Sequence, residues 1–167
     1  LQTALLLGLL RWSGAGLDSV GLGRSTWSAG WRWGLTGAAL FAVAAVGGGG
    51  LLNLLGLDPL ALIRTPLPTA PGERVLFFII GAAVAPVAEE VLFRGYLYTF
   101  CRRWGISAAL GLSTAVFVAM HLPSGLPVTQ VVGGLVFALA YEVSGSLLAA
   151  ILIHGLGNLA IFSLSLI

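Results

Sequence analysis

The sequence has little charge, no lysine and a single cysteine. Of its 167 residues only 8% are charged, and all eight basic residues are arginines. These arginines are scattered along the chain, which argues against the basic cluster that a nucleic-acid-binding surface needs. Cys101 has no partner cysteine, and this excludes an intrachain disulfide and a cysteine-based metal site.

Hydrophobic residues are abundant instead. They make up 58% of the chain, and the mean hydropathy of +1.03 predicts a membrane protein. Only helices or closed barrels satisfy backbone polar groups in lipid, and the apolar segments lack the two-residue alternation of barrel strands. The sequence therefore predicts an all-α, polytopic transmembrane helical bundle of about six helices. The predicted segments are residues 1–10, 33–57, 75–100, 107–122, 128–141 and 146–167, and the first, which starts within an apolar run, is expected to be truncated.

Very few ionisable residues lie inside these segments. Glu89, Glu90 and Arg94 fall in the third, His121 in the fourth and His154 in the sixth. A charged side chain at the bilayer centre costs roughly 2.5 to 3.5 kcal/mol, so these groups must face the bundle interior. Glu90 and Arg94 are spaced to form an ion pair on one helix face. Glu89 projects about 100° away and needs other partners, which the two histidines can supply.

Two further pairs share the four-residue spacing that places side chains on one helical stripe. They are Phe117 with His121, and His154 with Asn158. Interhelical polar contacts can be purely structural. Here, however, Glu89 and three polar groups of other helices would converge, which favours a site between the third, fourth and sixth helices.

Proline and glycine add two expectations about helix geometry. Pro86 has no backbone N–H, so it should loosen its helix and release a carbonyl that could bind water. The glycine runs 47–50 and 133–134 should allow neighbouring helices to approach closely.

The polar residues resemble the three motifs of the CPBP family, which comprises CAAX prenyl proteases and bacteriocin-processing, Abi-type intramembrane proteases. The resemblance covers roughly residues 75–167, the predicted catalytic core, whereas residues 1–74 add only N-terminal helices and loops to one integrated domain. The motifs in this chain are Glu89-Glu90-x-x-x-Arg94, Phe117-x-x-x-His121 and His154-x-x-x-Asn158. The segments FRGYLY and GSLLAAILIHGLGN also resemble the family's sequences.

The resemblance implies a glutamate-dependent intramembrane endopeptidase, often labelled a metalloprotease. Glu89 would be the general base on a water that His121 helps to hold, while His154 and Asn158 would donate to the developing oxyanion. The structural support would come from Glu90, Arg94 and Phe117. The implied partners are the lipid bilayer and a membrane-embedded or lipidated peptide. The implied location is a prokaryotic plasma membrane, with several membrane passes.

Alternatives remain open for the cofactor and the function. We expect no required cofactor, but zinc held by Glu89, His121 and His154 is the alternative, although the HExxH signature is absent. A proton- or ion-coupled transporter would use the same residues as a relay. A non-catalytic membrane scaffold that binds a partner helix is the third possibility.

Overall fold

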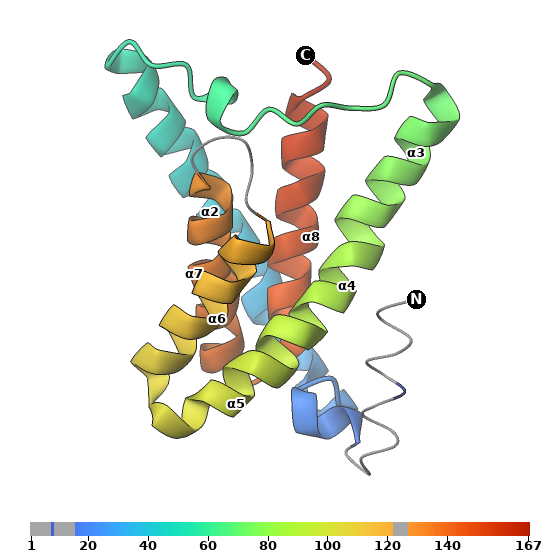
Figure 1. Ribbon diagram of the computed structural model, residues 1–167, viewed down its shortest axis with the longest axis vertical. Helices are drawn as coiled ribbons and strands as arrows, with labels where there is room; N and C mark the ends of the chain where they lie inside the picture. The colour runs from blue at the N-terminus through green and yellow to red at the C-terminus, as the bar shows by residue number, and fades with distance from the viewer. Residues whose placement is uncertain (1–7, 9–15, 122–126) are drawn as a thin grey trace.

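The computed structural model describes residue 8 and residues 16–121 and 127–167 (Figure 1). It is 83% helical, and no strand occurs in the described residues. The predicted all-α bundle is therefore confirmed, and residues 16–121 and 127–167 contain five long helical segments against the six predicted for the chain. The predicted first segment, residues 1–10, lies outside the described residues except for Gly8.

Short 3₁₀ turns precede and separate the long helices. The elements in chain order are the 3₁₀ turns η1 (Leu17–Val20) and η2 (Arg24–Thr26), α2 (Trp27–Leu54), the turn η3 (Leu60–Leu62), α3 (Pro71–Ile79), η4 (Ile80–Val84), α4 (Ala85–Glu90), η5 (Val91–Tyr98), α5 (Thr99–Cys101), the turn η6 (Arg102–Trp104), α6 (Ile106–Met120), α7 (Val128–Ser144) and α8 (Leu147–Leu164).

The elements from α3 to α5 follow one another as a single bent helix that crosses the whole molecule in Figure 1. Its stretches η4 and η5 are π-helical, and they flank the short α4 that carries the two glutamates. In a π-helix the N–H of residue i+5 bonds the carbonyl of residue i. Pro86 has no N–H, so the carbonyl of Gly81, five residues earlier, loses its π-helical donor.

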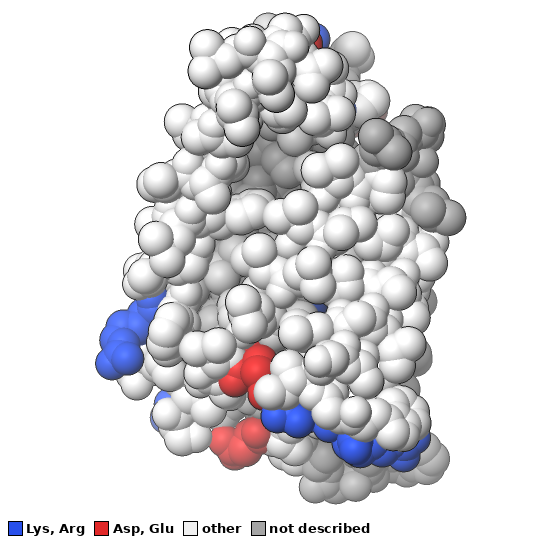
Figure 2. Space-filling model, turned by 90° about the vertical axis from the view of Figure 1, so that its left-hand side faces the viewer, with Lys and Arg blue, Asp and Glu red and all other residues white. Residues whose placement is uncertain are grey.

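Within the part of the chain that the structure describes, three helical stretches are long and apolar enough to cross a membrane. These are Asp18–Leu54, Pro71–Trp104 and Leu147–Leu164, whereas α6 and α7 are shorter apolar helices. Large apolar side chains face outward on α2, with Val46 77% exposed, as a lipid-facing helix requires. In Figure 2 most of the visible charged side chains lie toward the lower end of the molecule, and most of the visible face is uncharged.

Close packing of α2 against α8 depends on glycines in the first half of α2. A Cβ on Gly30 would lie 2.6 Å from Ser146 Oγ, and one on Gly34 would lie 2.7 Å from Leu152 Cδ1. The expectation that the glycine run at 47–50 allows close helix packing was wrong. A Cβ placed on Gly47, Gly48 or Gly50 would have no neighbour within 4 Å among the described residues. Of the pair at 133–134, Gly134 does abut another helix, at Thr114.

The core lies where η5, α6, α7 and α8 meet. Its buried residues are Phe93, Phe117, Phe137, Ala150 and Ile153. The rings of Phe93 and Phe117 meet edge to face at 5.0 Å between centroids. This aromatic cluster fixes the relative positions of the helices that carry the polar side chains.

Candidate active site

Glu90 and Arg94 form an ion pair inside the bundle. Arg94 Nη1 donates to Glu90 Oε1 at 2.8 Å, and both side chains are fully buried. Arg94 Nη2 donates to the carbonyl of Gly134 on α7 at 2.9 Å. The guanidinium also lies 4.9 Å from the ring centroid of Phe117, which adds a cation–π contact. The expected ion pair is therefore present, and it joins the bent helix to α6 and α7.

Glu90 has a second partner that the motif spacing does not show. His154 Nδ1, on α8, lies 2.8 Å from the same Oε1 atom of Glu90. An ionised carboxylate only accepts hydrogen bonds, so Nδ1 carries the proton. One face of the imidazole stacks on Phe137 of α7, at 4.5 Å between centroids and 13° between planes. These two contacts fix both the position and the orientation of the ring.

Glu89 faces the Nε2 atoms of the two histidines, whereas Glu90 contacts Nδ1 of His154. The Glu89 Oε2 atom lies 3.4 Å from His121 Nε2 and 3.7 Å from His154 Nε2. The Glu89 side chain is 27% exposed, whereas that of Glu90 is fully buried. Adjacent carboxylates thus occupy different environments, because one residue of helix rotates the side chain by about 100°.

His121 is held by its own helix. It lies one residue beyond the end of α6, and its Nδ1 lies 2.8 Å from the carbonyl of Phe117. A carbonyl can only accept, so Nδ1 donates and Nε2 is directed toward Glu89. The second motif therefore has a physical basis, since the residue four positions earlier supplies the acceptor that orients the histidine.

Asn158 is positioned by the backbone defect at Pro86. Its Nδ2 donates to the carbonyl of Gly81 at 2.8 Å, the carbonyl that lacks a π-helical donor. The released carbonyl that the sequence predicted is thus bonded by a side chain of α8. The close approach also requires small residues, because a Cβ on Gly155 would lie 2.5 Å from the carbonyl oxygen of Ala82.

The polar groups line a cavity of about 290 Å³. Its lining includes Glu89, His121, His154 and Asn158, the four residues that the sequence places in a site. The cavity also has walls from parts of the chain outside the three motifs: Phe41 of α2, Ile63 and Thr65 of the following loop, and Thr129, Gln130, Gly133 and Phe137 of α7. Its mixture of apolar walls and a few convergent polar groups is typical of a small ligand or substrate site.

Sequence reasoning missed three contributors to this arrangement. Phe137 and Gly134 lie on α7, a helix without an ionisable motif, and only a contact in space links them to the site. Gly81 lies five residues before Pro86, and that spacing is the one signal in the sequence that could have indicated a free carbonyl.

The fold and the cavity define a class: a membrane protein of several apolar helices that encloses a carboxylate–imidazole cluster among them. The family model described as "Type II CAAX prenyl endopeptidase Rce1-like" matches residues 71–160, more than half of the chain. The chain therefore belongs to the type II CAAX prenyl endopeptidase Rce1-like family, and this family indicates an intramembrane protease. No curated protein and no solved structure gives a significant match.

Proposed function

We propose that the chain is an intramembrane endopeptidase in which Glu89 activates the water that attacks the scissile peptide bond. The observation that carries this proposal is the approach of Glu89 Oε2 to two imidazole Nε2 atoms in the lined cavity. These distances exceed a direct hydrogen bond of about 2.7 to 3.2 Å. A water molecule that bridges Glu89 and His121 would satisfy both groups and would be in place to attack.

The proton transfers follow from this arrangement. Glu89 takes a proton from the attacking water and later gives it to the leaving amine, so the carboxylate is regenerated. His121 Nε2 accepts a hydrogen bond from the same water and orients it. General acid–base catalysis of this type contributes roughly 10² to 10⁴ in rate.

The oxyanion would be stabilised by α8. Asn158 uses one amide hydrogen on Gly81, and the second remains for the scissile carbonyl oxygen. His154 can donate from Nε2 only while its ring carries both protons, because Nδ1 is directed to Glu90. Removal of one such donor typically costs about 10² to 10³ in kcat.

Zinc is the alternative route to an activated water. Its ligands would be Glu89, His121 and His154, but no His/Cys/Asp/Glu group in the described part of the chain is arranged as a metal-ligand cluster. The steps above need only side chains and water, and chelation tests for a metal directly.

The substrate that fits the proposal is a membrane-embedded or lipidated peptide, cleaved in a prokaryotic plasma membrane. The walls of the cavity come from helices that are apolar along their length, so a hydrophobic peptide can approach it from within the bilayer. We do not favour a transporter or a scaffold, because neither requires that a carboxylate face two imidazoles in a cavity.

The test is cleavage in lipid by wild type and by Glu89→Gln. Both proteins are reconstituted into nanodiscs with a library of hydrophobic peptides, and products are identified by mass spectrometry, with and without a chelator. Glu89→Gln should lose cleavage by at least about 10²-fold and unfold at the wild-type temperature. Chelator should have no effect.

Glu73→Gln is the matched control, because Glu73 is an exposed glutamate in the first turn of α3. It should cleave as wild type does. Full cleavage by Glu89→Gln would remove Glu89 as the base, and inhibition by chelator would favour zinc. Transport of a solute that depends on Glu89 without any proteolysis would favour the transporter.

A further inference from the structure

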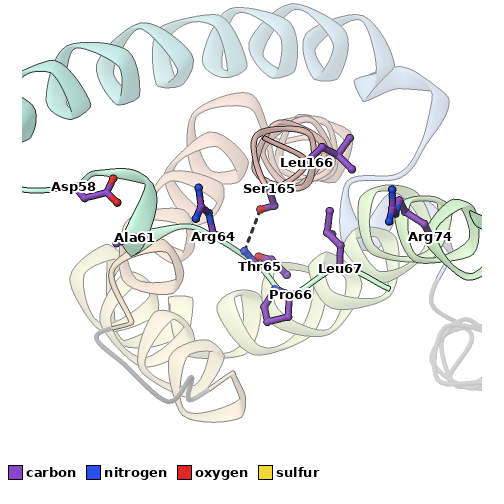
Figure 3. Close-up of a pocket in the computed structure, with 9 residues that line it drawn as sticks. All are labelled: Asp58, Ala61, Arg64, Thr65, Pro66, Leu67, Arg74, Ser165 and Leu166. Atoms are coloured by element: carbon purple, nitrogen blue, oxygen red, sulfur yellow. Dashed lines mark hydrogen bonds between the residues drawn. The ribbon is translucent and has the colours of Figure 1, made fainter. Parts of the chain in front are cut away.

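A second cavity, of about 640 Å³, lies at the end of the bundle where α2 and α8 terminate and α3 begins (Figure 3). It is lined by Asp58, Ala61, Arg64, Thr65, Pro66, Leu67, Arg74, Ser165 and Leu166. Two of these residues are arginines, and they stand on opposite sides of the cavity in Figure 3. No motif assigns a role to any of its residues.

The two arginines are not equivalent. Arg74 Nε donates to the carbonyl of Pro68 at 3.0 Å, and its Nη2 donates to that of Thr69 at 3.4 Å, so this guanidinium is tied to the loop. The guanidinium of Arg64 makes no hydrogen bond or ion pair with any other described residue. The acid of the cavity, Asp58, accepts from the backbone N–H of Leu60 at 2.9 Å. Arg64 is therefore the group that is free to bind an anion.

The two cavities adjoin at Thr65, which lines both of them. The loop is fixed at this residue, because the backbone N–H of Thr65 donates to Ser165 Oγ at 3.0 Å, and Ser165 Oγ in turn donates to Ile161 at the end of α8. Arg64 precedes Thr65 in the chain. A peptide bound in the catalytic cavity can thus extend past Thr65 toward this arginine.

We propose that Arg64 binds a carboxylate of the peptide substrate beyond the scissile bond. Guanidinium is the side chain best suited to a carboxylate, because its planar array of donors matches the two oxygens. Pro66, Leu67 and Leu166 line the same cavity and suit apolar side chains next to the carboxylate. Arg74 adds positive charge from the opposite side. This inference rests on the proposed peptidase function, and it concerns the part of the peptide that is recognised.

The test measures peptide binding separately from cleavage. The inactive Glu89→Gln protein is placed in nanodiscs of zwitterionic phosphatidylcholine and titrated with short fluorescein-labelled polyleucine peptides. One peptide ends in a carboxylate and one in a carboxamide, and two further amidated peptides contain a single internal Asp or Asn. Binding is followed by fluorescence anisotropy, and the titrations are repeated after adding Arg64→Gln.

The carboxylate peptide should bind about tenfold more tightly than the carboxamide peptide, and Arg64→Gln should remove this difference. Arg64→Lys should retain part of it, since the charge remains but the planar fork is lost. The matched control is Arg32→Gln, an exposed arginine near the start of α2 that lines neither cavity. It should leave the difference unchanged. A preference for the internal Asp over Asn would identify a side-chain carboxylate, and a preference for the free end a terminal one.

Equal affinity for acid and amide peptides, or binding of neither, would overturn the inference. So would an effect of Arg64→Gln that occurs equally with every peptide and only in nanodiscs containing phosphatidylglycerol, because that result would assign the cavity to a lipid phosphate. Cleavage by the wild-type protein is scored separately. Active enzyme with no acid–amide difference refutes the Arg64 site alone, whereas absence of cleavage refutes the peptidase.

Discussion

Replacement of Glu90 by glutamine tests how the buried ion pair supports the site. Both Glu90 and Arg94 are fully buried, and Arg94 Nη1 lies 2.8 Å from Glu90 Oε1. Glutamine keeps the shape and an acceptor oxygen but removes the charge that balances the guanidinium. Loss of one partner of a buried pair costs about 3 to 5 kcal/mol. For a chain of this length, the unfolding temperature should fall by on the order of 10 °C.

The matched control is Glu142→Gln, which removes an ion pair of the same length near the protein surface. Arg102 Nη2 lies 2.8 Å from Glu142 Oε1, but the two side chains are 43% and 23% exposed. Such pairs contribute about 0 to 1 kcal/mol. Both variants are unfolded by heat in detergent, with tryptophan fluorescence as the readout. Equal falls in unfolding temperature for the two variants would refute the claim that breaking the buried pair costs more stability than breaking the exposed pair.

A double variant separates the stability of the pair from its effect on the site. Glu90→Gln with Arg94→Met removes both charges, so no uncompensated charge stays buried, which is the main cost of breaking such a pair. The unfolding temperature should therefore return toward that of wild type. Cleavage should remain low, because His154 Nδ1 would still lack the carboxylate that orients it. A double variant no more stable than Glu90→Gln would show that an unbalanced guanidinium is not the cause.

Two other features give shorter tests. Gly34→Ala should destabilise the protein by roughly 1 to 3 kcal/mol, because the new Cβ would lie 2.7 Å from Leu152. Gly48→Ala should be neutral or slightly stabilising in the same thermal assay, because its Cβ would have no neighbour within 4 Å. Phe137→Leu should lower kcat about tenfold in the nanodisc cleavage assay, because the Phe137 ring stacks on His154 and holds the orientation of that imidazole. The accompanying loss of stability should be about 1 kcal/mol. Unchanged kcat would leave the ring a packing role only.

The sequence predicted those parts of the site that depend on one helix at a time. The ion pair of Glu90 and Arg94 follows from four-residue spacing, and the separation of Glu89 from that pair follows from the helical rotation per residue. The need to bury charge then indicated that Glu89 faces the histidines. The geometry agrees with this expectation, while the catalytic roles of these residues stay predictions.

Parts that depend on how helices are placed against one another could not be predicted. The glycines at 30 and 34 and those at 47–50 look equally suited to close packing, and only the position of α8 along α2 distinguishes them. Similarly, α7 has no motif, yet it supplies Phe137 and the carbonyl of Gly134. One sequence shows the hydrophobic period of each helix, but it does not show which residues contact the neighbouring helices.

His154 lies between the two adjacent glutamates and approaches both. Its Nδ1 meets Glu90 at 2.8 Å, and its Nε2 faces Glu89 at 3.7 Å. Adjacent residues of a helix cannot project to the same side, so one imidazole with two nitrogens is the kind of side chain that can contact both carboxylates at once. The buried carboxylate of Glu90 orients the ring, and the ring in turn faces the partly buried carboxylate of Glu89. The two adjacent glutamates therefore have different surroundings for a reason that lies in helix geometry, and we expect a substitution of either one to change the position of the other through His154.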